Sequence, residues 1–315
     1  MNAMYVSAMI LAILATLAGA IHHPPAAAAA EPMAELPLTV LVGGYQFPPY
    51  VEMNRSDGSI TGLTIETISA LNAQQDRYRF VFVPTTPTRR YQDFTNRRFD
   101  IMLFEMTNWG WTDQGIAVDA SGTIGADGEV YIAQARQDRD EGWFDTVTDQ
   151  KIAAILGYHY QFADFQNDPV QLRSRFDIVL VNDSEAVIAL VLRGRVMAGV
   201  VTRSFLERYL NRHPQDRARI LISTRLDQLY DLRVLAHPEA TLSAYAVRCL
   251  LADLDAADRL APLWQSHGLE PVPLRQVYLP LVPRASGVPG GACQTGADML
   301  PTRERIRPSP EKSGR

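Results

Sequence analysis

Residues 39–71, TVLVGGYQFPPYVEMNRSDGSITGLTIETISAL, carry the clearest pattern of secondary structure in the chain. This stretch overlaps an apolar, β-branched run at residues 38–42, which is typical of a strand buried in a parallel sheet and is ended by Gly43-Gly44. A helix is expected over residues 61–73, because apolar side chains recur there at helical spacing. Those side chains are Leu63, Ile65, Ile68 and Leu71. A strand, a turn and a helix in this order are the start of an α/β fold.

Strands and helices are expected to alternate along the rest of the chain, which predicts parallel sheets with helices on their faces. The further strands expected are 78–83, 101–104, 130–133, 152–156, 178–181, 196–201 and 232–236. The further helices expected are 88–96, 182–192, 205–210, 242–254 and 257–266. Asn182 and Asp183 are expected to cap the helix at 182–192. Asn182 and Glu185 stand three residues apart, as in a capping box, and Gly194 suits the end of this helix.

Two α/β lobes, each with its own sheet, are predicted from this order. Residues 38–125 form the first part of lobe 1, residues 126–229 form lobe 2, and residues 230–270 return to lobe 1. Residues 271–315 are rich in Pro and Gly and are expected to be a mobile tail. Ligands of open α/β sheets bind beyond the carboxyl ends of the strands, so the crevice between the lobes is the expected site.

The N-terminus predicts export. Residues 4–20 are apolar and uncharged, and a run of alanines reaches Ala30, so residues 1–30 are expected to be a Sec-type signal peptide cleaved near Ala30 or near Ala20. An uncleaved anchor is the alternative, because the apolar stretch is long and the n-region has no Lys or Arg. No cysteine follows the stretch, so no lipoprotein signal is present and the expected location is the periplasm.

Charge and cysteine content narrow the function further. The net charge is −5, and the basic excess lies in the tail, so the acidic body argues against nucleic acid as a partner. The two cysteines are Cys249 and Cys293. They could pair in an oxidising compartment, or Cys249 could be a buried small hydrophobe, and neither spacing predicts a metal site.

Three stretches resemble the family 3 extracellular solute-binding proteins, the amino-acid-type receptors of bacterial ABC importers. They are residues 39–71, NRRFDIMLFEMT at 96–107, and VNDSEAVIALVLRGRVMAGVV at 181–201, and the resemblance covers roughly residues 38–268. It implies a two-lobed, type II periplasmic-binding-protein fold with a hinge between the lobes. It also implies a monomer that binds a small molecule and works with a membrane permease or sensor in trans.

The ligand-site residues depart from the family pattern. Glu105 stands at the usual Gly position, and Thr112 falls where the resemblance implies an arginine that clamps the ligand carboxylate. Thr202 replaces the aspartate that holds the amino group in amino-acid receptors. Both charge clamps are therefore missing, and the expected ligand is a small polar solute other than a standard α-amino acid.

The candidate ligand-binding residues combine an aromatic wall with a few polar groups. Aromatic walls hold flat rings or cations, and Glu105 beside this wall would favour a cationic or hydroxyl-rich ligand. The residues are Tyr45, Phe47, Tyr50, Arg89, Glu105, Thr107, Trp109, Tyr158, Tyr160 and Thr202. The alternative is that the tryptophans, Trp111 above all, belong to the core and that Glu105 pairs with Arg89 or Arg90. His159 is expected to be a hydrogen-bonded histidine and not a metal ligand.

Hinge closure around a solute for an ABC-type importer is the predicted function, with no cofactor, no metal and no catalysis. A ligand sensor or accessory protein for a membrane partner is the second hypothesis. The third is an enzyme resembling the cyclohexadienyl dehydratases that share this fold, with Glu105 as a general acid.

Overall fold

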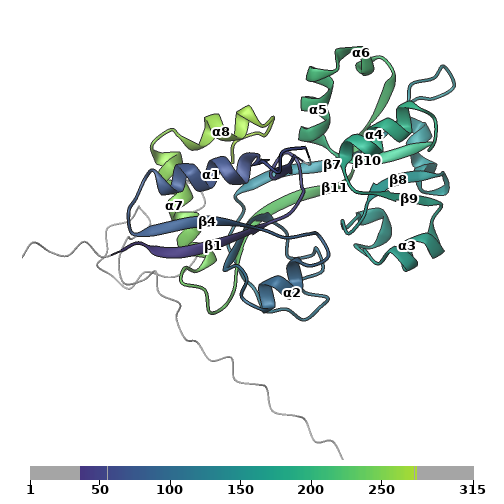
Figure 1. Ribbon diagram of the computed structural model, residues 1–315. Helices are drawn as coiled ribbons and strands as arrows, with labels where there is room; N and C mark the ends of the chain where they lie inside the picture. Colours follow the sequence, from purple (N-terminus) through teal and green to yellow (C-terminus); the bar gives the residue numbers. More distant parts are fainter. Residues whose placement is uncertain (1–35, 55, 273, 275–315) are drawn as a thin grey trace, which may run out of the picture. The chain divides into compact units, whose positions relative to one another are not determined.

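Nine strands within the described part of the chain form one curled, mixed sheet in the computed structural model, which describes residues 36–54, 56–272 and 274 (Figure 1). The strands are β1 (Leu38–Gly44), β4 (Tyr78–Pro84), β5 (Ile101–Glu105), β6 (Asp119–Ala120), β7 (Gly125–Gln134), β8 (Ile152–Ile155), β9 (Ile178–Val181), β10 (Ala198–Thr202) and β11 (Ile220–Ala236). A small hairpin holds β2 (Glu52–Met53) and β3 (Ile60–Thr61). The predicted signal peptide and Cys293 lie outside the described residues, as does all of the predicted tail except residues 271, 272 and 274.

The helices alternate with these strands as the sequence predicts. The α-helices are α1 (Leu63–Asn72), α2 (Arg90–Thr95), α3 (Pro169–Arg175), α4 (Ser184–Leu192), α5 (Arg203–Arg212), α6 (Pro214–Arg217), α7 (Ala244–Ala256) and α8 (Leu260–Ser266). Two 3₁₀ helices are η1 (Glu141–Asp149) and η2 (Gln161–Ala163). None of the helices in the described ranges has the length and apolar character that a membrane crossing requires.

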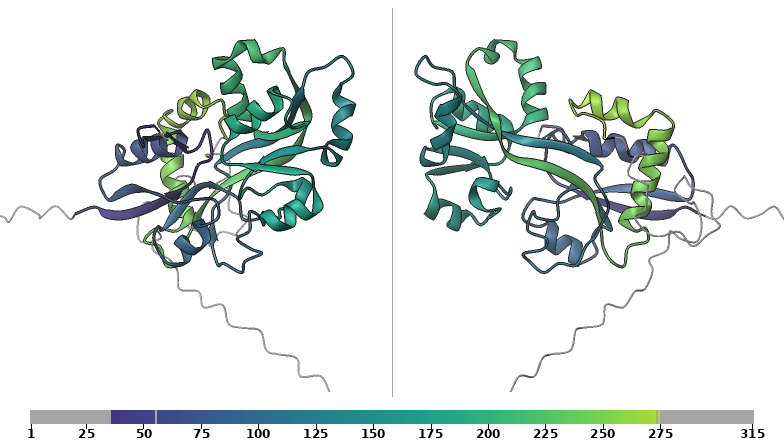
Figure 2. Two further views of the ribbon diagram at one scale, coloured as in Figure 1. Left: turned by 45° about the vertical axis from the view of Figure 1, so that its right-hand side comes forward. Right: turned by 180° about the vertical axis from the view of Figure 1, so that it is seen from behind.

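Two parallel groups of strands are joined by an antiparallel pair. β1 pairs in parallel with β4 and β5, and β8 pairs in parallel with β9 and β10. Between these groups, β11 runs antiparallel to both β5 and β7, and β7 runs antiparallel to β10. In both views of Figure 2, β7 and β11 pass from one group to the other. The predicted α/β fold is confirmed, but the two sheets share these strands instead of being separate.

The two crossing strands are longer than the sequence predicts. The expected strands 130–133 and 232–236 are the apolar ends of β7 and β11, which extend over residues 125–134 and 220–236. Polar side chains break the apolar pattern of the missed parts, and most of them are buried. They include Asp127, Glu129, Asp227 and Gln228. A sequence pattern that looks for apolar runs therefore ends these strands where they reach the buried polar site.

Helices cover the first group of strands on both faces. α1 packs on β4, and α2 lies against β1 on the opposite face, as Figures 1 and 2 show. α7 and α8 return to this group and contact α1. Trp264 of α8 fixes the return, because its indole Nε1 donates to the Ile124 carbonyl at 3.2 Å and its ring lies 5.4 Å from that of Phe104.

Helix α4 begins one residue later than the capping box predicts. The N-cap is Asp183, whose carboxylate accepts the Ala186 N–H at 2.8 Å, so the predicted capping by Asp183 is confirmed and that by Asn182 is wrong. Gly194 follows the C-cap Arg193 with a φ of +65°, a backbone conformation that favours glycine, and this prediction is confirmed.

Candidate functional site

Five aromatic side chains meet where the two parallel groups approach each other, and we call them the aromatic cluster. They come from the turn after β1, the turn after β5, the turn after β8 and strand β11, and they are Tyr45, Phe47, Trp109, Tyr158 and Tyr230. All five are buried. Together with Glu129 and His159 they line a cavity of about 10 Å³, which is room for about one water molecule.

Phe47 is the centre of the aromatic cluster. Its ring centroid lies 5.5 Å from that of Trp109 and 5.7 Å from that of Tyr158, and both pairs are edge-to-face. Tyr230 lies 5.9 Å from Phe47 and 5.1 Å from Trp109. Edge-to-face pairs at these separations are favourable, so the rings hold one another in this closed arrangement.

The structure brings four of the sequence-predicted residues to this cavity: Tyr45, Phe47, Trp109 and Tyr158. Tyr50 lies behind them, because its ring stacks on Phe47 at 4.6 Å and its hydroxyl donates to Asp127 at 3.2 Å. Tyr160 is also behind the wall, since its hydroxyl accepts the Ile155 N–H at 2.7 Å.

The remaining predicted residues lie in three different environments. Thr202 is buried and hydrogen-bonded to Tyr230. Thr107 is half-buried, and its carbonyl accepts the Thr112 hydroxyl at 3.3 Å. Arg89 is exposed, and its neighbour Arg90 is the arginine that points inward. Adjacent residues on a helix diverge by about 100°, so only one of the two can face the interior.

Glu105 is engaged by the protein itself. Its carboxylate lies 3.2 Å from the Arg90 guanidinium and accepts the Tyr45 hydroxyl at 3.2 Å and the Trp111 indole N–H at 3.1 Å. Arg90 and Glu105 are each 1 % exposed, so they form a fully buried ion pair. Burial raises the pKa of Glu105, and the Arg90 charge opposes that shift. This arrangement matches the alternative in which Glu105 pairs with an arginine and Trp111 belongs to the core.

Arg90 connects the ion pair to the aromatic wall. Its guanidinium lies over the Tyr45 ring at 5.0 Å and over the Tyr91 ring at 4.3 Å, and it donates to the carbonyls of Pro87 and Trp109. Cation–π contacts and carbonyl acceptors compensate for the hydration that a buried guanidinium gives up. The turn that carries Trp109 is thereby held against α2.

His159 joins the two parallel groups. Its Nδ1 lies 3.5 Å from the Arg90 guanidinium, and its Nε2 lies 3.2 Å from the Tyr91 hydroxyl, which itself donates to the Trp109 carbonyl at 2.7 Å. Arginine can only donate, so this network assigns Nδ1 as the acceptor and Nε2 as the protonated nitrogen. Burial and the Arg90 charge lower the pKa of His159 to about 3, which keeps the ring neutral.

Because of this low pKa, His159 should make stability fall in mild acid. The ordinary pKa is 6.5, so between pH 6.5 and pH 3 the folded state binds fewer protons than the unfolded chain. The free energy of unfolding is not reduced by His159 above pH 6.5. Between pH 6.5 and pH 5 the titration of His159 lowers it by about 2 kcal/mol. The measurement is urea unfolding at both pH values for the wild type and for His159→Gln, which cannot titrate.

The comparison with His159→Gln is necessary because nearby acids act in the opposite direction. Burial raises the pKa of Glu129 and of Asp227, so those groups add stability as the pH falls. The wild type and His159→Gln share the effect of these acids. The difference between their stability changes with pH therefore reports the imidazole alone. Parallel stability changes in the two proteins would show that His159 does not carry the acid sensitivity.

Two glycines allow the turn after β5 and the turn after β8 to pack closely against their neighbours. Gly110 has a φ of +80°, and a Cβ there would lie 2.6 Å from the Tyr91 hydroxyl oxygen and 2.8 Å from Nε2 of His159. Gly157 has a φ of +83°, and a Cβ there would lie 3.0 Å from Pro87. Side chains at either position would push the turn after β5 or the turn after β8 away from its neighbour.

Gly110→Ala is therefore expected to lower the free energy of unfolding by about 2–4 kcal/mol, from backbone strain together with overpacking. Gly115→Ala is the matched control, because Gly115 has a φ of +66° with no atom within 4 Å of its Cβ position. The control should cost only about 1–2 kcal/mol. Chemical denaturation of both variants tests this, and equal costs would mean that the close approach at Gly110 contributes nothing.

Sequence reasoning missed two residues of the cavity wall, Glu129 and Tyr230, and also Gln228, which bonds to the wall; all three are on the crossing strands. Gln228 donates to Glu129 at 2.6 Å and accepts the Trp109 indole N–H at 3.0 Å. Burial raises the pKa of Glu129 well above its ordinary value, and the negative charge of Asp227 raises it further. The available signal in the sequence was the presence of polar residues within stretches that otherwise resemble β-strands. That signal would have indicated that β7 and β11 contribute to the site.

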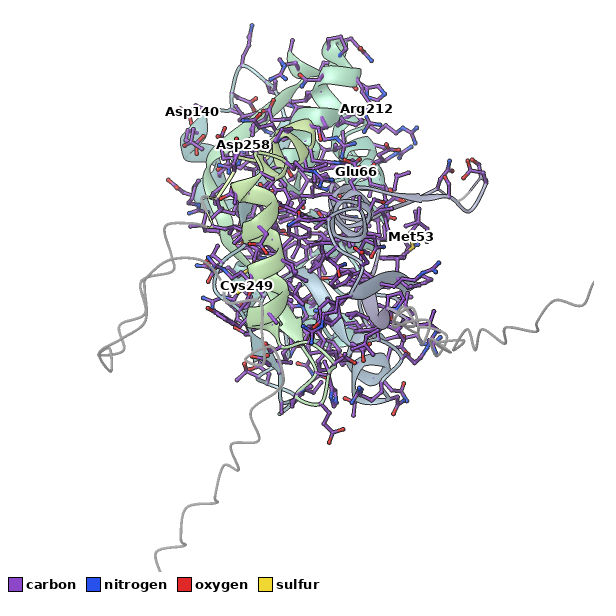
Figure 3. All side chains as sticks on the ribbon, turned by 90° about the vertical axis from the view of Figure 1, so that its left-hand side faces the viewer. Met53, Glu66, Asp140, Arg212, Cys249 and Asp258 are labelled. Carbon is purple, nitrogen blue, oxygen red and sulfur yellow. The ribbon has the colours of Figure 1, made fainter. Side chains whose placement is uncertain are left out.

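A larger polar groove of about 540 Å³ lies on the other side of the turn after β1. Met53 of the hairpin and Arg212 of α5, both labelled in Figure 3, line it together with the start of α4. Gln46 also lines the groove, while its chain neighbours Tyr45 and Phe47 line the inner cavity. Among the residues the structure describes, no group of His, Cys, Asp and Glu is arranged to hold a metal ion.

Comparison with solved structures confirms the fold. The substrate-binding protein of an amino acid ABC transporter is 14% identical with a TM-score of 0.54, over 72% of this chain and 98% of that one. The fold is that of the two-lobed periplasmic binding proteins. A histidine kinase sensor domain with similarity to periplasmic binding proteins is 13% identical with a TM-score of 0.55, over 74% of this chain and 98% of that one.

A third similar structure is the ancestral amino-acid-binding protein AncCDT-1, described as a precursor of cyclohexadienyl dehydratase. It is 16% identical with a TM-score of 0.54, over 72% of this chain and 94% of that one. No family model matches the sequence. No curated protein matches it either. At these identities the likeness establishes the fold alone.

Proposed function

We propose that the protein is a periplasmic solute-binding protein that captures a small polar solute by closing two lobes about β7 and β11, for an ABC-type importer. The observation that carries this proposal is the set of hydrogen bonds across the site. Tyr158, after β8, donates to the Gln46 carbonyl, after β1, at 2.8 Å, and Tyr91 of α2 contacts His159. A ligand that touches both lobes would stabilise this closed arrangement over an open one.

The solute is proposed to differ from a standard α-amino acid. Thr112, at the position where the resemblance implies a carboxylate clamp, is exposed, and Thr202, at the amino-group clamp, is hydrogen-bonded to Tyr230. The buried arginine nearby, Arg90, is paired with Glu105. The cavity wall therefore holds no unpaired arginine that could replace the carboxylate clamp.

Sensing for a membrane partner is the second candidate, and the likeness to a kinase sensor domain favours it. Catalysis has less support. A general acid must be able to give up a proton toward a substrate, whereas Glu105 accepts hydrogen bonds from Tyr45 and Trp111 beside Arg90. Co-purification of the mature protein with a permease or with a membrane kinase would separate transport from sensing.

A thermal-shift screen of the mature protein tests the binding function. The panel holds amino acids, polyamines, betaines, sugars and aromatic acids, and a solute at 100 times its Kd should add about 2.7 kcal/mol of stability. At least one non-amino-acid solute is expected to give such a shift. If plain α-amino acids were the strongest stabilisers, the proposal about the clamps would be wrong, and turnover of prephenate-like acids would make the protein an enzyme.

A further inference from the structure

We infer that the ligand is a compact organic cation, a methylated ammonium, held by the aromatic cluster with Glu129 as its counter-charge. The inference rests on the proposed solute-binding function and names its ligand class. It starts from a buried carboxyl group that faces the cavity and has no positive partner.

Glu129 is 1 % exposed and lines the inner cavity. Its side-chain contacts are with neutral groups, the Gln228 amide at 2.6 Å and the Tyr230 hydroxyl. The charged residues that influence it are Asp227 and Asp127, both acidic. No ion pair within the described ranges includes Glu129, so its negative form is uncompensated.

The other buried acids near the site have positive neighbours. Glu105 pairs with Arg90 at 3.2 Å, and Asp127 lies 3.7 Å from Arg203. Asp227 accepts the Tyr131 hydroxyl and two backbone N–H groups, and Arg225 also favours its charged form. Glu129 is thus the acid beside the cavity for which a cation must come from outside the chain.

The rest of the cavity wall suits a cation without hydrogen-bond donors. Phe47, Trp109, Tyr158 and Tyr230 present rings to the cavity, and aromatic rings attract cations, with quaternary ammonium cages as the best-known use. Tyr45 already carries the Arg90 guanidinium at 5.0 Å, which shows that this wall accepts a positive charge. Glu105 neutralises that guanidinium, so it does not exclude a second cation.

The closed cavity, at about 10 Å³, is smaller than any organic ligand. A solute must therefore enter while the lobes are apart and take space that the rings now fill. Gln228 accepts the Trp109 indole N–H and donates to Glu129, so the position of Trp109 is coupled to that of the carboxyl group.

Binding should also release a proton. Burial and the negative charge of Asp227 raise the pKa of Glu129, which favours the protonated carboxyl in the empty site, and a cation bound beside it would lower that pKa. The other titratable groups that face it are His159, Asp227, Asp127, Tyr230 and Tyr158. Below the pKa of Glu129 the affinity for the cation should rise about tenfold per pH unit.

Isothermal titration with two matched probes tests the inference. Choline is a quaternary ammonium, and 3,3-dimethylbutan-1-ol has the same shape without the charge. Choline is expected to bind about tenfold or more tightly than the alcohol. In two buffers of different ionisation enthalpy, choline binding should release protons from the wild type and none from Glu129→Gln. The variant should also lose the preference for choline.

The outcomes separate the two proposals. Equal binding of choline and the alcohol to the wild type would overturn the cation inference without any variant, as would an unchanged preference in a folded Glu129→Gln protein. If choline and the betaines fail while a panel solute without a methylated ammonium group stabilises the protein, the inference fails and the binding function stands. If no solute stabilises it, the binding function fails as well.

Discussion

Replacing Arg90 by methionine is expected to lower the free energy of unfolding by about 3–5 kcal/mol, because the change leaves Glu105 as an unpaired charge in the interior. Both partners are 1 % exposed, and the same guanidinium donates to the carbonyls of Pro87 and Trp109. Urea denaturation of the purified variant measures the loss.

A double-mutant cycle shows whether this loss belongs to the pair. Adding Glu105→Gln to Arg90→Met removes the unpaired charge and should recover part of the stability. Arg217→Met is the surface control, since Arg217 lies 3.1 Å from Glu207 with both side chains 49% exposed, and it should cost at most about 1 kcal/mol. Equal losses for Arg90→Met and Arg217→Met would rule out a special role for the buried pair.

Trp109→Ala is expected to lower the free energy of unfolding by about 3–5 kcal/mol, as for other large buried aromatic residues. The indole packs edge-to-face on Phe47 and Tyr230, and its N–H donates to Gln228. The variant would also leave the Gln228 oxygen without its donor, so unfolding free energies should be compared with those of Trp109→Phe.

Trp143→Ala serves as the control for loss of an indole away from the site. Trp143 is half-buried on η1 and contacts Phe144 and Arg139, so its loss should cost about 1–2 kcal/mol. If Trp143→Ala were as destabilising as Trp109→Ala, the aromatic cluster would hold the closed arrangement no more firmly than a peripheral contact does.

The sequence predicts much of this fold because local signals agree with it. The run at 38–42 and the helical spacing at 61–73 give β1 and α1 nearly at their observed bounds. The turn after β1 carries Tyr45 and Phe47, and the family resemblance, together with the rule that ligands bind beyond the ends of parallel strands, implied that this turn faces the crevice. These predictions depend on residues that are close together in the sequence. Patterns in a single sequence describe such local relations well.

Features that depend on distant contacts were not predictable. The sequence left Arg89 and Arg90 as equal partners for Glu105, because the direction of each side chain depends on where α2 begins and on what it packs against. The predicted crossing strands stopped short of Asp127 and Gln228, since these polar residues pair with groups about 75 to 120 positions away. The closed cavity itself is lined by residues from five separate segments of the chain, and no local pattern encodes it.

Closure about β7 and β11 can be measured as a distance between spin labels on the two lobes. Ser69 of α1 is exposed, and Val170 of α3 is 68% exposed, so labels attached through p-acetylphenylalanine at these positions avoid the native cysteines. Pulsed EPR should give a longer or broader distance distribution without solute. With the strongest stabiliser from the thermal-shift panel, it should give one shorter, narrow distance. An unchanged distribution with a solute that binds would contradict hinge closure.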